Sequence, residues 1–338
     1  MNFLAHNIRD NFFDLSTFAL QSPNVPRPLS VNHSSPMNWS SQSQVIIQGI
    51  TTTQTIEYVL QMKTYGTQVV AAINPGRGGD KIEDIPIFDL VEEAIAEFDQ
   101  IDTSLIFVSP YEVLDAGREA IAAGIKRIII FTTEVPPLDI ISLLQYAAAH
   151  QTLVLGPGSE GIVIPEQICL GKLQPEFYQP GTVGLISSSK HLSYEVAWEL
   201  NQAGIGQSIA VSLGNEPILG SSLATWLSIL NGDPQTKAIV AIGNNTNDLE
   251  EIIASQEQEK YDKPIVVYIV GLNTPQEKVF QDATTIITNH LSFSIPVVNR
   301  DRENITELSK MGIKVAKRLD LIPDLLQKAM SDSKIKST

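Results

Sequence analysis

Residues 45–73, VIIQGITTTQTIEYVLQMKTYGTQVVAAI, carry the pattern that decides the fold. An apolar run, 45–48, ends at Gly49. A segment with helical spacing follows at 54–65, and a second apolar run, 69–73, closes the unit. Short apolar runs that alternate with helices are typical of a parallel sheet covered by helices on both faces. Such a sheet binds ligands at the carboxyl ends of its strands.

The same alternation runs along most of the chain, and a stretch with Pro175, Pro180 and Gly181 interrupts it once. Before the interruption, apolar periodicity predicts further elements, with strands at 104–108, 127–131 and 152–155 and helices at 111–123 and 137–150. After it, the pattern predicts strands at 182–186, 208–212, 238–242 and 265–270 and helices at 192–203, 222–231, 248–260 and 321–330. We therefore predict two α/β domains, 44–175 and 176–338, after an N-terminal extension, 1–43.

The extension differs from the rest of the chain. Apolar residues recur in it at helical spacing, namely Phe3, Leu4, Ile8, Phe12, Leu15 and Phe18. A Pro/Ser/Asn-rich stretch, 22–36, follows and has the composition of a linker. Two interpretations stay open: a tail that is disordered or folds onto its own protein, or a helix at 1–21 that docks into a partner's groove.

Composition excludes several classes of function. The 338 residues are 43% hydrophobic and 18% charged, with a net charge of −15 and no block of Lys or Arg, which argues against nucleic-acid binding. The single cysteine, Cys169, forms no intrachain disulfide, so a reducing, cytoplasmic location is expected. The five histidines are scattered, which predicts no metal site. Apolar runs are too short to span a membrane.

Two loops at predicted strand ends have the composition of anion-binding loops. Residues 51–54, Thr-Thr-Thr-Gln, open the first helix, where unpaired N–H groups and the helix dipole favour a phosphate. Threonine is also a common helix cap, so the loop alone does not establish a site. Residues 74–79, Asn-Pro-Gly-Arg-Gly-Gly, combine close backbone approach with one fixed positive charge. The two together favour a phosphorylated ligand.

These loops and several later segments resemble the α subunit of succinyl-CoA synthetase. In that family a Thr-Gly-Ser-Gln loop and a Pro-Gly-Lys-Gly-Gly loop contact coenzyme A, and arginine replaces the lysine here. The family's Ile-Thr-Glu segment is similar to residues 131–133, and its Gly-Pro-Asn-Cys-Pro-Gly turn resembles 156–161. The resemblance implies coenzyme A as cofactor and a set of residues that contact it: Thr51, Thr52, Thr53, Gln54, Pro75, Gly76, Arg77, Thr132 and Thr133.

The resemblance continues in the second half, where residues 181–195 are similar to the family's Gly-Lys-Val-Gly-Ile-Val-Ser-Arg-Ser-Gly-Thr-Leu-Thr-Tyr-Glu signature. It implies a substrate or anion site at Ser187, Ser189 and Tyr194. The central Gly-Thr pair of the signature is replaced by Lys190 and His191, which places bulk where a phosphate would approach the backbone.

Two replacements affect the chemistry that the resemblance implies. In the family a histidine in a Gly-His-Ala-Gly loop takes up phosphate, and a glutamate orients it. Here these positions are Asp282 and Asn244. Imidazole forms a labile phosphoramidate, whereas a carboxylate would form an acyl phosphate. We expect His290, eight residues further on, and His191 to be ordinary loop histidines and not catalytic replacements.

The resemblance covers residues from about 45 to the C-terminus and implies a Rossmann-like CoA-binding domain, a flavodoxin-like ligase domain and a β-type partner subunit. The leading hypothesis is a catalytically degenerate α-subunit homologue that binds or assembles, with residues 1–21 recruiting a partner. One alternative is an active succinate–CoA ligase, driven by ATP or GTP, with an altered phosphoacceptor. Another is a sensor of CoA or acyl-CoA that acts without a partner.

Overall fold

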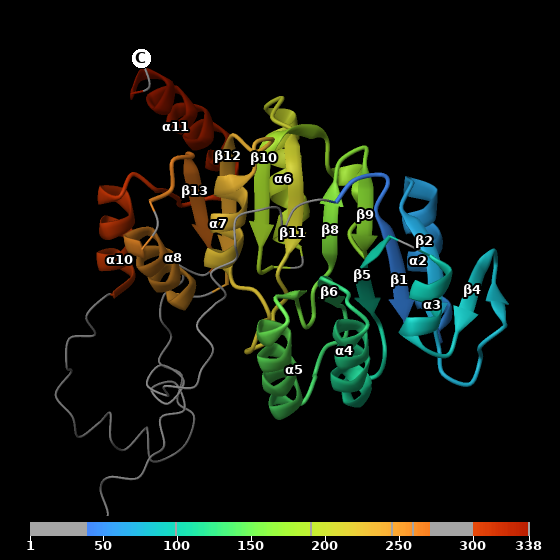
Figure 1. Ribbon diagram of the computed structural model, residues 1–338. Helices are drawn as coiled ribbons and strands as arrows, with labels where there is room; N and C mark the ends of the chain where they lie inside the picture. Colours follow the sequence, from blue (N-terminus) through green and yellow to red (C-terminus); the bar gives the residue numbers. More distant parts are fainter. Residues whose placement is uncertain are drawn as a thin grey trace, which may run out of the picture.

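The computed structural model describes residues 39–98, 100–189, 191–244, 246–258, 260–270 and 300–336. Within them, two seven-stranded sheets lie next to one another with helices packed against them (Figure 1). The predicted fold class is therefore confirmed. Residues 1–21, Asp282 and His290, which carry three of the sequence-based predictions, lie outside the described residues.

The first sheet has the strand order β3-β4-β2-β1-β5-β6-β7, and every pair except β3–β4 is parallel. Its strands are β1 (Gln44–Gln48), β2 (Gln68–Ile73), β3 (Lys81–Ile82), β4 (Ile85–Phe88), β5 (Ile101–Ile106), β6 (Arg127–Ile130) and β7 (Leu153–Leu155). Its helices are α2 (Thr53–Tyr65), α3 (Val91–Glu97), the short η1 (Pro110–Glu112), α4 (Val113–Ala122) and α5 (Pro137–Ala149).

The second sheet has the order β14-β13-β12-β10-β11-β8-β9, parallel from β14 to β11 and antiparallel beyond. Its strands are β8 (Gly161–Ile164), β9 (Ile168–Gly171), β10 (Pro180–Ser187), β11 (Gln207–Ser212), β12 (Ala238–Gly243), β13 (Ile265–Ile269) and β14 (Lys314–Ala316). The helices that the structure describes here are η2 (Pro175–Phe177), α6 (Leu192–Gln202), α7 (Leu223–Gly232), α8 (Thr246–Gln258), α10 (Arg300–Lys310), η3 (Leu319–Leu321) and α11 (Ile322–Lys336).

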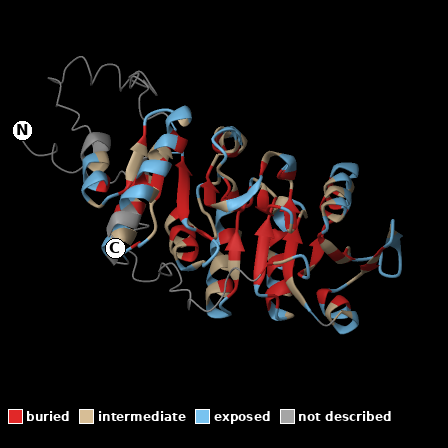
Figure 2. Cartoon of the chain, turned by 90° about the horizontal axis from the view of Figure 1, so that it is seen from above, coloured by how far each residue is buried: buried red, intermediate tan, exposed pale blue. Residues whose placement is uncertain are grey.

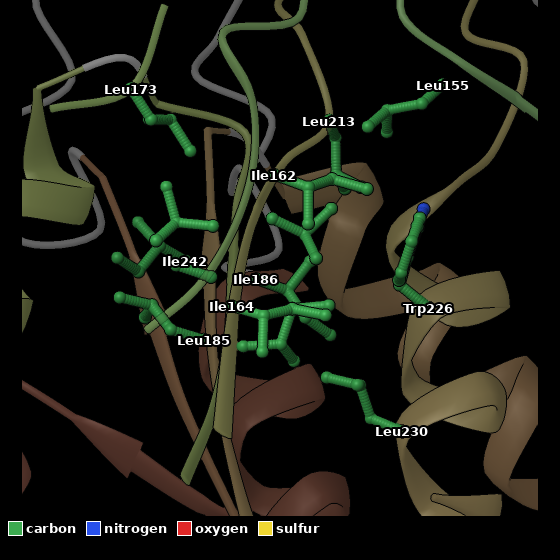
Figure 3. Close-up of a cluster of buried hydrophobic side chains, with 14 of the residues drawn as sticks. Leu155, Ile162, Ile164, Leu173, Leu185, Ile186, Leu213, Trp226, Leu230 and Ile242 are labelled. Atoms are coloured by element: carbon green, nitrogen blue, oxygen red, sulfur yellow. The ribbon is translucent and has the colours of Figure 1, made fainter. Parts of the chain in front are cut away.

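Central strands of both sheets are buried on both faces, which explains their continuous apolar runs. All residues of β11 and β12 are buried, and Figure 2 shows buried strands between helices whose outer faces are exposed. In the second sheet, Trp226 and Leu230 of α7 belong to the same buried cluster as Leu185 and Ile186 of β10 (Figure 3). This packing fixes the strand ends from which the loops of a site extend.

The hairpin formed by β8 and β9 crosses from one half of the chain to the other. The sequence-based division ends the first domain at residue 175, yet β8 pairs with β11, so this hairpin extends the second sheet. Figure 1 shows it between β11 and the first sheet. Across the junction, Thr67 donates its hydroxyl hydrogen to the Cys169 carbonyl over 2.6 Å and accepts the Cys169 N–H at 3.1 Å. The hairpin therefore joins the two halves.

A second link between the halves is Trp39, which the sequence-based division places in the N-terminal extension. Trp39 is 4% exposed and its indole N–H donates to the Thr103 hydroxyl over 3.0 Å. Its ring stacks on Trp226 of α7 at 6.4 Å between ring centroids, and the Arg127 guanidinium lies 4.6 Å from the ring centroid. Trp39 therefore belongs to the packed core although it precedes the first strand.

Candidate functional site

The first candidate site lies where the strand order of the first sheet reverses. Strands β2 and β4 lie on one side of β1, and β5, β6 and β7 lie on the other. In open α/β sheets, ligands bind outside the carboxyl ends of the strands at such a reversal, which here are the ends of β1 and β5. The sequence-predicted cofactor residues follow β1, β2 and β6, so the structure brings their loops to the same sheet edge.

The loop after β1 is shaped for close backbone approach. Gly49 has φ of +90°, and a Cβ there would lie 2.6 Å from the Val108 backbone nitrogen, so only glycine fits. Thr52 caps α2 by accepting the Thr55 N–H at 3.1 Å. Thr51, Thr52, Thr53 and Gln54 are all exposed. They form an exposed N-terminus of α2 at the carboxyl edge of the sheet.

The loop after β2 holds a carboxylate that the sequence analysis missed. Oδ1 of Asp89, just after β4, accepts the N–H groups of Gly76 at 2.7 Å, Arg77 at 3.1 Å and Gly78 at 2.8 Å. The Arg77 Nε donates to the Asp80 carboxylate over 3.1 Å. Residues 75–80 are all exposed. The Gly-rich loop is therefore accessible, but its backbone donors already have an acceptor.

The loop after β6 meets the second half of the chain. Thr132 donates its hydroxyl hydrogen to the Val108 carbonyl over 2.7 Å. Glu134 has φ of +60°, and its N–H donates to the Glu216 carboxylate over 3.1 Å. Thr133 lies beside Gly158, where an added Cβ would be 3.3 Å from the threonine methyl group. Thr132 and Thr133 thus stand at the junction between the halves.

An aromatic stack and a lysine behind this edge were also missed by sequence reasoning. The rings of Phe107 and Phe131 stack at 4.3 Å between centroids, and the Lys172 ammonium lies 5.9 Å and 5.6 Å from the two centroids. Lys172 also donates to the Phe131 carbonyl over 3.2 Å. Phe107 directly follows β5 and Phe131 directly follows β6, so the stack packs the ends of these two strands together.

The second candidate site lies at the carboxyl ends of β10 and β12, the point where the order of the second sheet reverses. Ser187 donates its hydroxyl hydrogen to the Ser189 carbonyl over 2.8 Å and accepts the Ser189 N–H at 3.0 Å. Asn244 donates its side-chain N–H to the Ser188 carbonyl over 2.7 Å, and its backbone N–H donates to Asp248 over 2.7 Å. The structure therefore brings Ser187, Ser189 and Asn244 together.

Tyr194, the third predicted residue of this site, has other neighbours. Its hydroxyl accepts the Gln174 N–H at 3.3 Å, and its ring lies 5.1 Å from that of Phe177. Burial raises the pKa of the Tyr194 phenol, so it stays protonated in this packing. Tyr194 therefore attaches α6 to the segment around η2. His191, at the cap position of α6, is exposed.

Glu251 adds a further carboxyl group beside this site. It lies on α8 and accepts the Ala224 N–H at 3.3 Å, in the first turn of α7. Burial raises its pKa, although a hydrogen bond from Ser222 and the Ala224 N–H oppose the shift. The N-terminus of α7 is therefore capped by a carboxyl group of the chain itself.

The described residues contain no cluster of three or more His, Cys, Asp or Glu side chains arranged to hold a metal ion. Among the helices in the described part of the chain, none combines the length and apolar character needed to cross a membrane.

Both halves of the chain are similar to domains of known protein families. A sequence model of the CoA binding domain matches residues 40–134, and a model of the flavodoxin-like domain of succinyl-CoA ligase matches residues 180–292. The α subunit of the ADP-forming succinate–CoA ligase of Aquifex aeolicus is 35% identical over 250 residues, which is 73% of this chain and 82% of that protein. The Staphylococcus aureus α subunit is 32% identical over 81% of this chain and 88% of its own length.

Solved structures agree on the fold. ATP citrate lyase from Methanothrix soehngenii, in complex with citrate and coenzyme A, superimposes with a TM-score of 0.68 at 17% identity over 89% of this chain. The dinucleotide-forming acetyl-coenzyme A synthetase 1 of Candidatus Korarchaeum cryptofilum does so with a TM-score of 0.61 at 20% identity over 87% of this chain. The chain spans 51% of the first protein and 60% of the second.

Proposed function

Because the chain belongs to the succinate–CoA ligase α-subunit family, we propose that it binds coenzyme A and acts through binding or assembly with a partner instead of relaying phosphate. The cofactor would bind at the carboxyl edge of the first sheet, where the strand order reverses. Its pyrophosphate would face the N-terminus of α2 at residues 51–54, where exposed donors and the helix dipole favour an anion.

The proposed loss of phosphate transfer rests on two sequence positions that the family resemblance identifies. Asp282 replaces the phosphohistidine, and a carboxylate does not form the labile phosphoramidate. Asn244 replaces the glutamate that orients it, and an amide carries no charge to stabilise an imidazolium. The hydrogen bond from Asn244 to the Ser188 carbonyl carries the proposal, because it gives this side chain a structural role within the strand ends.

The proposed partner is a β-type subunit. The relatives are named as α subunits of succinate–CoA ligase, and the proposal extends such pairing to this chain. Residues 1–21, with their apolar stripe, are proposed to strengthen the association. A cytoplasmic location is part of the same proposal, since the one cysteine needs no oxidising compartment.

One experiment separates this proposal from catalysis. The chain and its cognate β subunit are purified together and incubated with labelled ATP, and the protein is then tested for acid-labile phosphate. We expect none on the α-like chain, and we expect calorimetry to detect coenzyme A binding. Succinate- and nucleotide-dependent thioester synthesis by the complex would overturn the proposal. Deletion of residues 1–21 is expected to weaken association with the β subunit. Unchanged association would contradict the proposed role of residues 1–21.

The relatives' names favour a second candidate, an active acid–thiol ligase with an altered acceptor. Under this reading Asp282 would become phosphorylated, and hydroxylamine would trap the acyl phosphate. Substitution of Asp282→Asn is the matched control, because the amide cannot accept phosphate while its size is retained. Activity that disappears in Asp282→Asn would establish the second candidate.

A further inference from the structure

The Gly-rich loop after β2 is built around a side chain of the chain itself. One oxygen of Asp89 accepts three consecutive backbone N–H groups, from Gly76, Arg77 and Gly78, at 2.7–3.1 Å. Successive N–H groups that converge on one point form a concave anion site, the kind that holds phosphate oxygens in other proteins. In this loop the anion is a carboxylate. The donors that the sequence makes available to a phosphate are therefore already engaged.

Asp89 is held in this position from both sides. Its own N–H donates to the Glu93 carboxylate over 3.1 Å, and the Phe88 carbonyl accepts the Asn74 N–H at 3.0 Å. A Cβ at Gly78 would lie 2.6 Å from Oδ2 of Asp89, so this glycine leaves room for the carboxylate. The loop conformation and the position of Asp89 therefore depend on each other.

Arg77 is the part of the loop that can turn toward a ligand. In the structure its Nε pairs with Asp80 over 3.1 Å, and the two side chains are 45% and 57% exposed. An ion pair this exposed stabilises by little, because water competes with it. A phosphate monoester offers the guanidinium a stronger, bidentate acceptor. The pair with Asp80 can therefore exchange for a pair with a bound phosphate.

The place of Arg77 in the fold indicates which phosphate it would meet. In sheets of this strand order, the ligand's pyrophosphate lies at the helix after the first strand, and its ribose lies near the end of the second strand. Residues 51–54 follow β1, whereas Arg77 follows β2. An arginine at the second position accommodates a phosphate on the ribose. Coenzyme A carries such a phosphate on its 3′-oxygen, and dephospho-coenzyme A does not.

We propose that Asp89 is a positioning residue that holds the loop so that the Arg77 side chain, and not the loop's backbone N–H groups, recognises the ribose phosphate of coenzyme A. This inference rests on the proposed binding of coenzyme A in the first domain. It assigns discrimination between coenzyme A and dephospho-coenzyme A to Arg77, and it assigns the geometry of Arg77 to Asp89.

Calorimetric titration with coenzyme A and with dephospho-coenzyme A tests the proposal on the full chain. The unsubstituted chain is expected to prefer coenzyme A by about tenfold or more, the size of a charge-assisted hydrogen bond. Arg77→Ala is expected to remove the preference, and so is Asp89→Ala, while affinity for dephospho-coenzyme A changes by no more than about twofold. The double variant should match Arg77→Ala alone, because coupled residues are not additive.

Asp89→Asn is the matched variant. Its amide oxygen still accepts the three N–H groups, so most of the preference for coenzyme A should remain. Circular dichroism and thermal unfolding establish that each variant is folded.

Three results would overturn the proposal. Higher affinity of Asp89→Ala for coenzyme A would show that the freed N–H groups bind the phosphate themselves. An equal loss for both ligands in that variant would reduce Asp89 to a structural role. Equal affinity of the unsubstituted chain for both ligands would remove the role of Arg77 while leaving coenzyme A binding intact. Binding of neither ligand would defeat the proposed function itself, and this inference with it.

Discussion

Asn244 and Ser188 join the ends of two neighbouring strands: Nδ2 of Asn244, after β12, donates to the carbonyl oxygen of Ser188, after β10, over 2.7 Å. The two residues flank the point where the order of the second sheet reverses. Asp248 accepts the backbone N–H of Asn244 at 2.7 Å, so one residue uses two donors to close this edge. Asn244 therefore contributes to the fold at this edge of the second sheet.

Replacing Asn244 by aspartate should therefore destabilise the chain. A carboxylate cannot donate to the Ser188 carbonyl, and it would lie near the Asp248 carboxylate. We expect Asn244→Asp to lower the free energy of unfolding by about 1–2 kcal/mol, measured by urea denaturation. Asn215→Asp makes the same chemical change at another exposed loop position and should stay within about 0.5 kcal/mol. Equal stability of Asn244→Asp and the parent would contradict the structural role.

Trp39 should contribute strongly to stability although it precedes the first strand. Trp39→Ala removes the stack on Trp226, the hydrogen bond to Thr103 and the contact with Arg127. We expect a loss of about 3–5 kcal/mol in the free energy of unfolding, as for other buried tryptophans. Trp198→Ala is the control, since Trp198 is 54% exposed and should cost little. Similar losses in both variants would mean that Trp39 does not join the halves.

Glu251 should make stability depend on pH. Burial raises its pKa above the ordinary value of 4.5, so the folded chain holds this proton more tightly than the unfolded chain. The contribution is fully present below the unfolded pKa and is lost as pH rises through the folded pKa. Glu251→Gln removes the buried charge, so it should raise the melting temperature at about pH 7 and lose this advantage toward about pH 4.

Glu250→Gln serves as the control for this pH dependence. Glu250 is the exposed neighbour of Glu251 on α8. Its substitution should change the melting temperature little at any pH. A melting temperature of Glu251→Gln that stays equal to that of the parent across the range would show that the carboxyl of Glu251 is not buried in its charged form.

Cys169 should resist thiol reagents in the folded chain. The side chain is fully buried, and burial raises the pKa of its thiol to about 12, so little thiolate forms near neutral pH. We expect alkylation at about pH 8 to be negligible in native protein and complete in urea. The chain has one cysteine, so the signal is unambiguous. Fast labelling under native conditions would indicate that β9 opens readily.

The sequence predicts most strands and helices because their apolar runs are long enough to carry a period. The unit at 45–73 appears as β1, α2 and β2 with shifts of about one residue. The pattern misses β3, which has two residues, and the hairpin of β8 and β9, whose runs have four residues each. Nothing local in 161–171 indicates pairing with β11, because that partner lies some 50 residues further along the chain.

The sequence predicts that the candidate loops lie at strand ends, but it does not predict their contacts. Family resemblance and strand-end logic located the segments around Thr52, Arg77 and Ser187. The sequence analysis does not identify the Asp89 carboxylate. The signal for it is that Asp89 directly follows β4, which pairs in parallel with β2, so the carboxyl ends of the two strands lie side by side. The contact of Asn244 with Ser188 depends on tertiary pairing of β10 with β12, which no local pattern encodes.

The crossing hairpin means that a cut at the sequence boundary, residue 175, does not divide the chain into two complete sheets. A cut at residue 175 would leave the first fragment with two apolar strands that have no sheet to join. In the other fragment β11 would become an edge strand with unpaired backbone N–H and C=O groups. Such an edge promotes pairing with other chains and aggregation. A fragment that holds either sheet alone would therefore need a boundary before Gly161. The hairpin of β8 and β9 would then stay with the second sheet, to which it belongs.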